Sequence, residues 1–229
     1  MNRALYLGID VGVDRGCAFT ALDERANMLE SGWFDGDLPP GLIEFIQNAA
    51  TTGKAVHVGI DAPRCPVPEP RDWYWNGHTR EWRERKRERG SGRHCEVVLK
   101  AHGLGNPQWT PVESSVIPFW MKVGFDLFEQ LEAMDRVHVH EVFPSASYIL
   151  LEGEHEPRVS VNFSEFRAGP KDVLDSCVAA VTVREFCLKR GCEVGGGDGL
   201  GTIVLPRKLK VTIQEVMDWP TGERSAAAA

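Results

Sequence analysis

The sequence lacks several features that would assign it to a familiar class at once. Its cysteines include no Cys-x-x-Cys pair and no closely spaced framework, so we expect reduced thiols in a cytoplasmic protein rather than a disulfide scaffold or a structural zinc site. No apolar run is long enough to cross a bilayer and the opening residues do not form a secretory signal, so we expect no membrane partner. We find no internal repeat. The six cysteines are Cys17, Cys65, Cys95, Cys177, Cys187 and Cys192.

Positive charge is also scarce. The chain has 33 acidic and 26 basic residues, which give a formal net charge of -7. It is therefore not coated in positive charge for general nucleic-acid binding, and a nucleic-acid partner would have to meet a local basic patch. With 229 residues, of which 42% are hydrophobic and 26% charged, the composition is typical of a globular protein with a sizeable core.

The sequence does contain two buried strands that each end in aspartate. Residues 4–10 and 55–61 carry apolar side chains at both odd and even positions, which is typical of strands covered on two faces. The two strands end at Asp10 and Asp61. A meander of strands up to residue 34 and a helix around 42–46 lie between them. Because such a crossover makes the two strands parallel neighbours, we expect Asp10 and Asp61 to lie side by side at one sheet edge.

The character of the chain changes between residues 62 and 111. Four prolines oppose regular structure at its start, and the charge-dense run 80–89 predicts an exposed helical excursion with Glu–Arg pairs, inserted into the main domain. The neighbouring Trp73, Tyr74, Trp75 and Trp82 could stack bases, or could form the hydrophobic underside of the insertion. After the charge-dense run we expect helices over 93–103, 112–133 and 171–190, and strands over 137–142 and 202–206.

A set of carboxylates could meet at the shared sheet edge. Asp172 and Asp175 lie three residues apart at the start of one helix, so their side chains point from one face. Oxygen ligands suit Mg²⁺ or Mn²⁺, and two such ions about 3.5–4 Å apart can hold the attacking and leaving oxygens of a phosphodiester displacement. Each carboxylate alone has a simpler role in a turn, at a helix start or in an ion pair, but together they favour metal-dependent catalysis. The set is Asp10, Asp61, Glu141, Asp172 and Asp175.

Basic residues and histidines are less informative. Arg93 and Lys171 could contact phosphate, and we count them as candidate substrate-binding residues. His138 and His140 project from one face of a predicted strand, and we expect them to be ordinary core or surface histidines.

Several short motifs occur in an order that resembles a known family. They are Gly8-Ile9-Asp10, Gly59-Ile60-Asp61-Ala62-Pro63, Gly92-Arg93-x-Cys95-Glu96, Glu141-Val142-Phe143-Pro144 and Lys171-Asp172-Val173-Leu174-Asp175. The chain up to Pro206 resembles the domain of unknown function 429 family, predicted nucleases related to ribonuclease H and the Holliday-junction resolvases. Arg64 departs from the aliphatic residue we expect there, and we add it to the candidate substrate-binding residues.

The resemblance implies an α/β fold and an activity. The expected fold is a ribonuclease H-like five-stranded mixed sheet, order 3-2-1-4-5, flanked by helices, in a single domain over 1–210 that includes the helical insertion, with a tail over 211–229. Asp10, Asp61 and Asp175 would bind Mg²⁺ or Mn²⁺, with Glu141 and Asp172 as further candidates. The implied activity is hydrolysis of phosphodiester bonds in DNA or RNA.

Two other functions compete with nuclease activity. The same acidic cluster could belong to a non-catalytic interaction module, with residues 62–111 as a protein-partner surface. Actin-like kinases and ATPases also open with a Gly-x-Asp hairpin that holds nucleotide phosphates, but they need two copies of the domain. This chain has one opening motif, so we rank that alternative lower. The sequence does not determine the oligomeric state.

Overall fold

The computed structural model describes residues 4–12, 16–85, 90–153, 170–209 and 219–220. The chain divides into two compact units. The first comprises 1–64, 118–193 and 203–208, and the second comprises 65–117, 194–202 and 209–229. Residues 13–15, part of the charge-dense run and most of the predicted tail lie outside the described residues.

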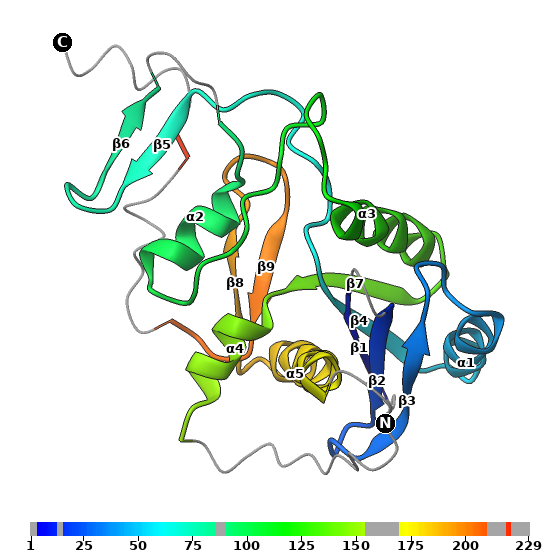
Figure 1. The fold of residues 1–229 in the computed structure, drawn as a ribbon. Coiled ribbons are helices and arrows are strands. Elements are labelled where there is room, and N and C mark those ends of the chain that lie inside the picture. Colours follow the sequence, from blue (N-terminus) through cyan, green and yellow to red (C-terminus); the bar gives the residue numbers. More distant parts are fainter. Residues whose placement is uncertain (1–3, 13–15, 86–89, 154–169, 210–218, 221–229) are drawn as a thin grey trace. The chain divides into compact units, whose positions relative to one another are not determined.

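A mixed seven-stranded sheet is the main feature of the fold (Figure 1). Its strands are β1 (Ala4–Asp10), β2 (Cys17–Leu22), β3 (Met28–Phe34), β4 (Ala55–Asp61), β7 (Val137–Val142), β8 (Cys192–Gly195) and β9 (Thr202–Leu205). The first three form an antiparallel meander, and β4, β7 and β9 follow β1 in parallel, giving the order β3-β2-β1-β4-β7-β9-β8. The predicted mixed α/β sheet is confirmed. The predicted count of five strands is wrong, because β9 and β8 extend the sheet beyond β7.

The pairing of β1 with β4 has the predicted direction and register. The two strands are parallel along their whole length, with Gly8 opposite Gly59 and Asp10 opposite Asp61. Because partners in register project to the same face of a sheet, the two carboxylates lie next to each other at the end of their strands.

Helices cover both faces of this sheet (Figure 1). On one face, α1 (Pro40–Thr51) and α3 (Phe119–Glu132) pack against alternate residues of β1 and β4, including Leu7 and Val58. On the other face, α5 (Pro170–Cys187) packs against Tyr6 and Val142, and α4 (Pro144–Leu151) contacts α5. The expected alternation of side chains along the strands therefore assigns Gly8, Asp10, Gly59 and Asp61 to the α5 face.

Two glycines allow α5 to lie unusually close to the sheet. A Cβ atom at Gly8 would lie 1.9 Å from the carbonyl oxygen of Ser176 and 2.4 Å from the backbone nitrogen of Ala180. A Cβ atom at Gly59 would lie 2.6 Å from the Val183 side chain. The buried hydroxyls of Thr20 and Ser176 are hydrogen-bonded at 2.8 Å and further fix the helix on the sheet. This close packing brings the first turns of α5 to the ends of β1 and β4.

The second unit contains a hairpin where the sequence predicts a helix. Strands β5 (Trp73–Asn76) and β6 (Glu81–Glu84) are antiparallel, with Trp75 opposite Trp82 and their rings 5.5 Å apart. The Asn76 side chain accepts hydrogen bonds from the backbone N–H groups of His78 and Thr79, which closes the turn. The helical prediction is therefore wrong over 81–84, because cross-strand aromatic packing and an Asn-Gly turn outweigh the Glu–Arg spacing. This unit also contains α2 (His94–Ala101).

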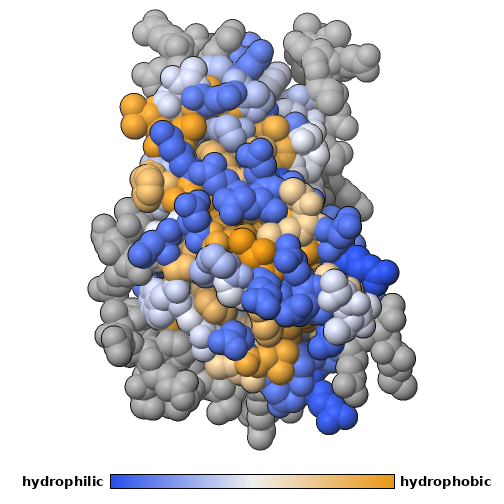
Figure 2. Space-filling model, turned by 90° about the vertical axis from the view of Figure 1, so that its right-hand side faces the viewer, coloured by the Kyte–Doolittle hydropathy of each residue, from blue (hydrophilic) through white to orange (hydrophobic). Residues whose placement is uncertain are grey.

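No helix among the described residues combines the length and apolarity needed to cross a membrane. Figure 2 shows one face of the molecule, on which hydrophilic and hydrophobic residues are interspersed.

Candidate metal centre

Three carboxylates from three different elements converge beneath the start of α5. Asp10 ends β1, Asp61 ends β4, and Asp175 lies in the second turn of α5. Each offers a carboxylate oxygen, and these oxygens all lie within 4.8 Å of one another. Asp175 is buried, with 5% of its surface exposed, and the two strand residues are half-buried. The sequence prediction that these residues meet is confirmed.

The two strand carboxyl groups have raised pKa values. Burial, together with the charges of Asp175 and Asp172, raises the pKa of Asp10 to about 7. Burial and the charges of Asp10 and Asp175 raise the pKa of Asp61 well above its ordinary value. A hydrogen bond links the Asp10 and Asp61 side chains, which requires a proton between them. The protein thus holds more negative charge in this space than its own cations neutralise.

Two residues partly compensate that charge. The Lys171 ammonium is paired with one carboxylate oxygen of Asp175, and the Tyr148 hydroxyl donates a 2.8 Å hydrogen bond to the other. The hydrogen bond to Asp175 raises the pKa of Lys171, and burial beside Asp175 raises that of Tyr148. Lys171 is a predicted substrate-binding residue, whereas no sequence signal pointed to Tyr148, which lies in α4.

The other two predicted carboxylates lie outside this group of three. Asp172, at the start of α5, is close enough for its charge to raise the pKa of Asp10. Glu141 is in register with Ile60, whose side chain belongs to the core on the α3 face, so Glu141 projects from the opposite face of the sheet to Asp61. It is buried and accepts a 2.9 Å hydrogen bond from the backbone N–H of Arg64.

The predicted substrate-binding arginines make protein contacts. Arg64 pairs with Glu132 of α3 and donates a 2.8 Å hydrogen bond to the carbonyl oxygen of Val139. Arg93 belongs to the second unit and is 1% exposed, with its guanidinium paired to Glu96 at 3.0 Å. Burial of this pair explains the Gly-Arg-x-Cys-Glu motif locally, because each charge requires the other once both leave water.

The predicted aromatic and basic region forms a cavity within the second unit. Its volume is about 340 Å³. The lining combines aromatic rings with two basic side chains, Arg85 and Lys100, whose charged groups lie 5.6 Å from the Tyr74 ring and 5.1 Å from the Trp109 ring respectively. The aromatic lining residues are Trp73, Tyr74, Trp75, Trp109 and Trp219.

A second group of metal-ligating side chains lies under the far end of α5, and the sequence analysis missed it. His57 of β4, His140 of β7 and Cys187 of α5 offer two nitrogens and a sulfur within 4.8 Å of one another. Burial, reinforced by neighbouring histidines, lowers the pKa of both imidazoles to about 4, and burial raises the pKa of the Cys187 thiol to about 11. One pattern could have found part of the group: His57 lies two residues from Gly59 and four from Asp61 on one strand, so these positions share a face of the sheet.

Comparisons with protein-family models, with curated proteins and with solved structures found no match in any of the three. The resemblance to the domain of unknown function 429 family therefore stays a prediction. The function is inferred below from the geometry of the chain's own residues.

Proposed function

We propose that this protein is a metal-dependent nuclease that hydrolyses phosphodiester bonds of nucleic acid. The observation that carries the proposal is the convergence of Asp10, Asp61 and Asp175, from β1, β4 and α5, with their oxygens within 4.8 Å of one another. Residues separated by more than a hundred positions in the chain meet at one point, and α5 is held there by contacts to Gly8 and Gly59 that leave no room for a side chain.

The donor set fits Mg²⁺ or Mn²⁺. It offers only hard carboxylate oxygens, which these ions prefer, and it carries the excess negative charge that a divalent cation would neutralise. When bound, such ions supply a nucleophilic water and neutralise the charge that develops on the phosphate. Asp10, Asp61 and Asp175 would hold the ions, and Asp172 stays a further candidate, whereas Glu141 projects from the other face of the sheet.

The chain's own residues have distinct roles in this proposal. Asp10 and Asp61 share a proton without metal and release it when a cation takes its place. Tyr148 holds one oxygen of Asp175 and so orients that carboxylate. Lys171, whose side chain is 78% exposed, can move from Asp175 to a substrate phosphate, since lysine is flexible and its charge is always available near neutral pH.

The cavity of the second unit supports nucleic acid as the substrate class. Base stacking on aromatic rings is sequence-tolerant and is worth about 1–3 kcal/mol per base, and neighbouring cations contact the phosphates. The cavity offers both kinds of group, through residues such as Trp75 and Lys100. A single-stranded segment is the substrate that can present unpaired bases to these rings.

The test is cleavage of labelled single- and double-stranded DNA and RNA in Mg²⁺ or Mn²⁺. We expect metal-dependent cleavage that Asp10→Asn lowers at least a hundredfold, because the ions lose one of their ligands. Asp126→Asn, which changes an exposed aspartate on α3, is the matched control and should retain wild-type activity. Thermal unfolding of both variants verifies that each is folded.

Two outcomes would contradict the proposal. Cleavage that continues in excess EDTA, or that survives in Asp10→Asn, would exclude this mechanism. Absence of cleavage together with no Mn²⁺-induced rise in Tm would favour a non-catalytic interaction module, because an ion that binds the folded protein must stabilise it.

A further inference from the structure

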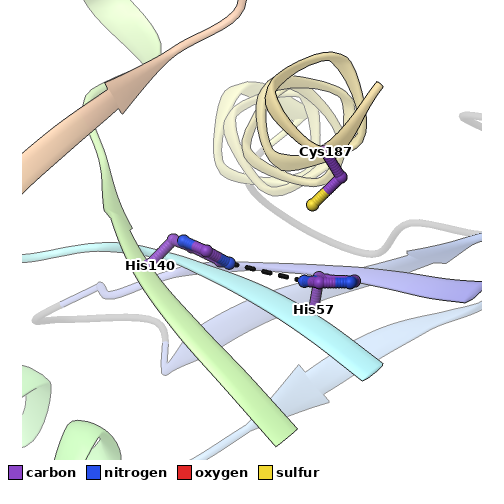
Figure 3. A group of neighbouring side chains, drawn as sticks. All are labelled: His57, His140 and Cys187. Atoms are coloured by element: carbon purple, nitrogen blue, oxygen red, sulfur yellow. Dashed lines mark hydrogen bonds between the residues drawn. The ribbon is translucent and has the colours of Figure 1, made fainter. Parts of the chain in front are cut away.

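The histidine and cysteine group at the far end of α5 is built from three well-packed elements. His57 projects from β4, His140 from β7 and Cys187 from the last turn of α5 (Figure 3). Figure 3 shows the Cys187 sulfur directed from the helix toward the two imidazole rings. All three side chains are half-buried, so they are neither part of a dry core nor fully open to solvent.

The distance between the two imidazoles suits a pair of metal ligands better than a strong hydrogen bond. Nε2 of His140 lies 3.5 Å from Nδ1 of His57. Good hydrogen bonds to nitrogen donors are shorter, at about 2.7–3.2 Å, so this one is weak. Two nitrogens that each lie about 2.1 Å from a tetrahedral zinc ion are about 3.4 Å apart. The observed separation is close to that value, so the two nitrogens are spaced as ligands of one shared ion would be.

We propose that His57, His140 and Cys187 bind one zinc-class transition-metal ion, separate from the carboxylate centre. Two imidazole nitrogens and a thiolate are ligands that Zn²⁺ prefers and that Mg²⁺ and Mn²⁺ do not. The Cys187 thiol gives its proton to solvent when its sulfur binds, so the three residues supply one negative charge. Three protein ligands leave a fourth tetrahedral position for water.

The surroundings hold the ligands in place. His57 is stacked between Tyr6, at 5.8 Å between ring centroids, and His138, at 4.9 Å, while the edge of Phe186 meets His140 at 5.5 Å. These contacts fix the ring planes before any ion arrives, which lowers the conformational entropy lost on binding. The site also lies at the C-terminal end of α5, where the helix dipole favours a cation.

The two centres are separated along one helix. Asp175 and Cys187 are twelve residues apart in α5, which corresponds to about 18 Å at 1.5 Å per residue. The proposed zinc-class site is therefore independent of the nuclease proposal, and either can fail while the other stands.

The test is titration of the full-length metal-free protein with Co²⁺, which reports thiolate ligation by a near-ultraviolet charge-transfer band. We expect the band to saturate at one equivalent of Co²⁺ and to be lost in Cys187→Ser, and we expect His140→Gln to weaken the binding that the band reports at least tenfold. Cys192→Ser, which changes another half-buried cysteine, and Asp175→Asn should both retain the band. Zn²⁺ should displace the bound Co²⁺.

A measurement on the unaltered protein covers the case in which a variant does not fold. X-ray absorption of the Zn²⁺-loaded wild type should show one sulfur at about 2.3 Å and nitrogen or oxygen ligands at about 2.0–2.1 Å. No band in the Co²⁺ titration, a band that follows Cys192 rather than Cys187, or a zinc shell without sulfur would each overturn the proposal.

Discussion

At the scale of single residues, the most informative feature is a carboxyl group with a raised pKa. Asp10 has a pKa of about 7 because it is partly buried and faces Asp175 and Asp172. The sequence predicts this meeting through a simple pattern, two strands with buried residues at both parities that each end in aspartate. It could not predict Tyr148, because nothing in the local sequence of α4 indicates which distant acid its hydroxyl contacts.

The raised pKa of Asp10 predicts how stability depends on pH. Between an unfolded-state pKa of 3.8 and a folded-state pKa of about 7, the folded protein retains a proton that the unfolded chain releases. The stabilisation is therefore fully present below the unfolded-state value and is lost as pH rises through the folded-state value, by an amount on the order of a few kcal/mol. In EDTA, Tm of the wild type should fall between pH 4.5 and 8 more steeply than Tm of Asp10→Asn.

The same coupling between proton binding and stability predicts how a control variant and the addition of metal behave. Asp126→Asn should keep the wild-type pH dependence in EDTA, since that aspartate is exposed on α3. With saturating Mn²⁺, the increase in Tm should be larger at pH 8 than at pH 5.5, because protons compete with the cation for the carboxylates. Equal pH slopes for the wild type and Asp10→Asn would show that Asp10 has an ordinary pKa.

At the scale of elements, the position of α5 on the sheet creates the carboxylate centre. The sequence predicts the helix and its Asp-x-x-Asp start, and the strand parity places Gly8 and Gly59 on one face. It does not show that these glycines are the contact points for α5, since that depends on where the helix crosses the sheet. The β5–β6 hairpin was mispredicted because the Glu–Arg spacing along the chain favoured a helix. The contact that stabilises the hairpin joins Trp75 and Trp82 across two strands, and sequence spacing does not show it.

Substitution of Gly8 tests the packing of this helix. In Gly8→Ala the new Cβ atom would meet backbone atoms of Ser176 and Ala180, which move only if the whole helix moves. We expect a loss of about 1–3 kcal/mol in the free energy of unfolding and a weaker Mn²⁺-induced rise in Tm. Urea unfolding and thermal melts with and without Mn²⁺ measure the two effects.

A second glycine supplies the matched control. Gly41 lies in the first turn of α1, and a Cβ atom there would have nothing within 4 Å. Gly41→Ala should therefore leave the response to Mn²⁺ unchanged and gain up to about 1 kcal/mol, as alanine favours helix. A Gly8→Ala protein as stable as wild type, with an intact Mn²⁺ response, would show that α5 does not need this close approach.

At the scale of the whole molecule, the formal net charge of -7 opposes the binding of a nucleic-acid partner. The chain as a whole repels phosphate, so attraction must come from local basic groups such as Arg83 and Arg85 of the second unit. The sequence predicted a distinct region over 62–111, and the structure assigns 65–117 to the second unit together with 194–202 and 209–229. The assignment of 194–202 to this unit could not be predicted, because the glycine-rich residues 195–201 predict a flexible linker.

The salt dependence of binding tests that local attraction. We expect affinity for a single-stranded oligonucleotide in EDTA to fall steeply with salt, and the slope of log K against log salt to decrease by about one for each phosphate contact removed. Arg85→Gln should lower this slope, whereas Lys122→Gln, on the exposed surface of α3, should not. Fluorescence anisotropy measures both, and a flat salt dependence would remove the basic region from the binding surface.

The helix α5 carries Asp175 near its start and Cys187 at its end, so one stiff rod links the two ion sites that we propose. Any sliding of that rod along its axis alters the ligand spacing at both ends together. Thermodynamic reciprocity then requires equal effects in both directions. The factor by which bound Mg²⁺ or Mn²⁺ changes the affinity for Zn²⁺ must equal the factor by which bound Zn²⁺ changes the affinity for Mg²⁺ or Mn²⁺.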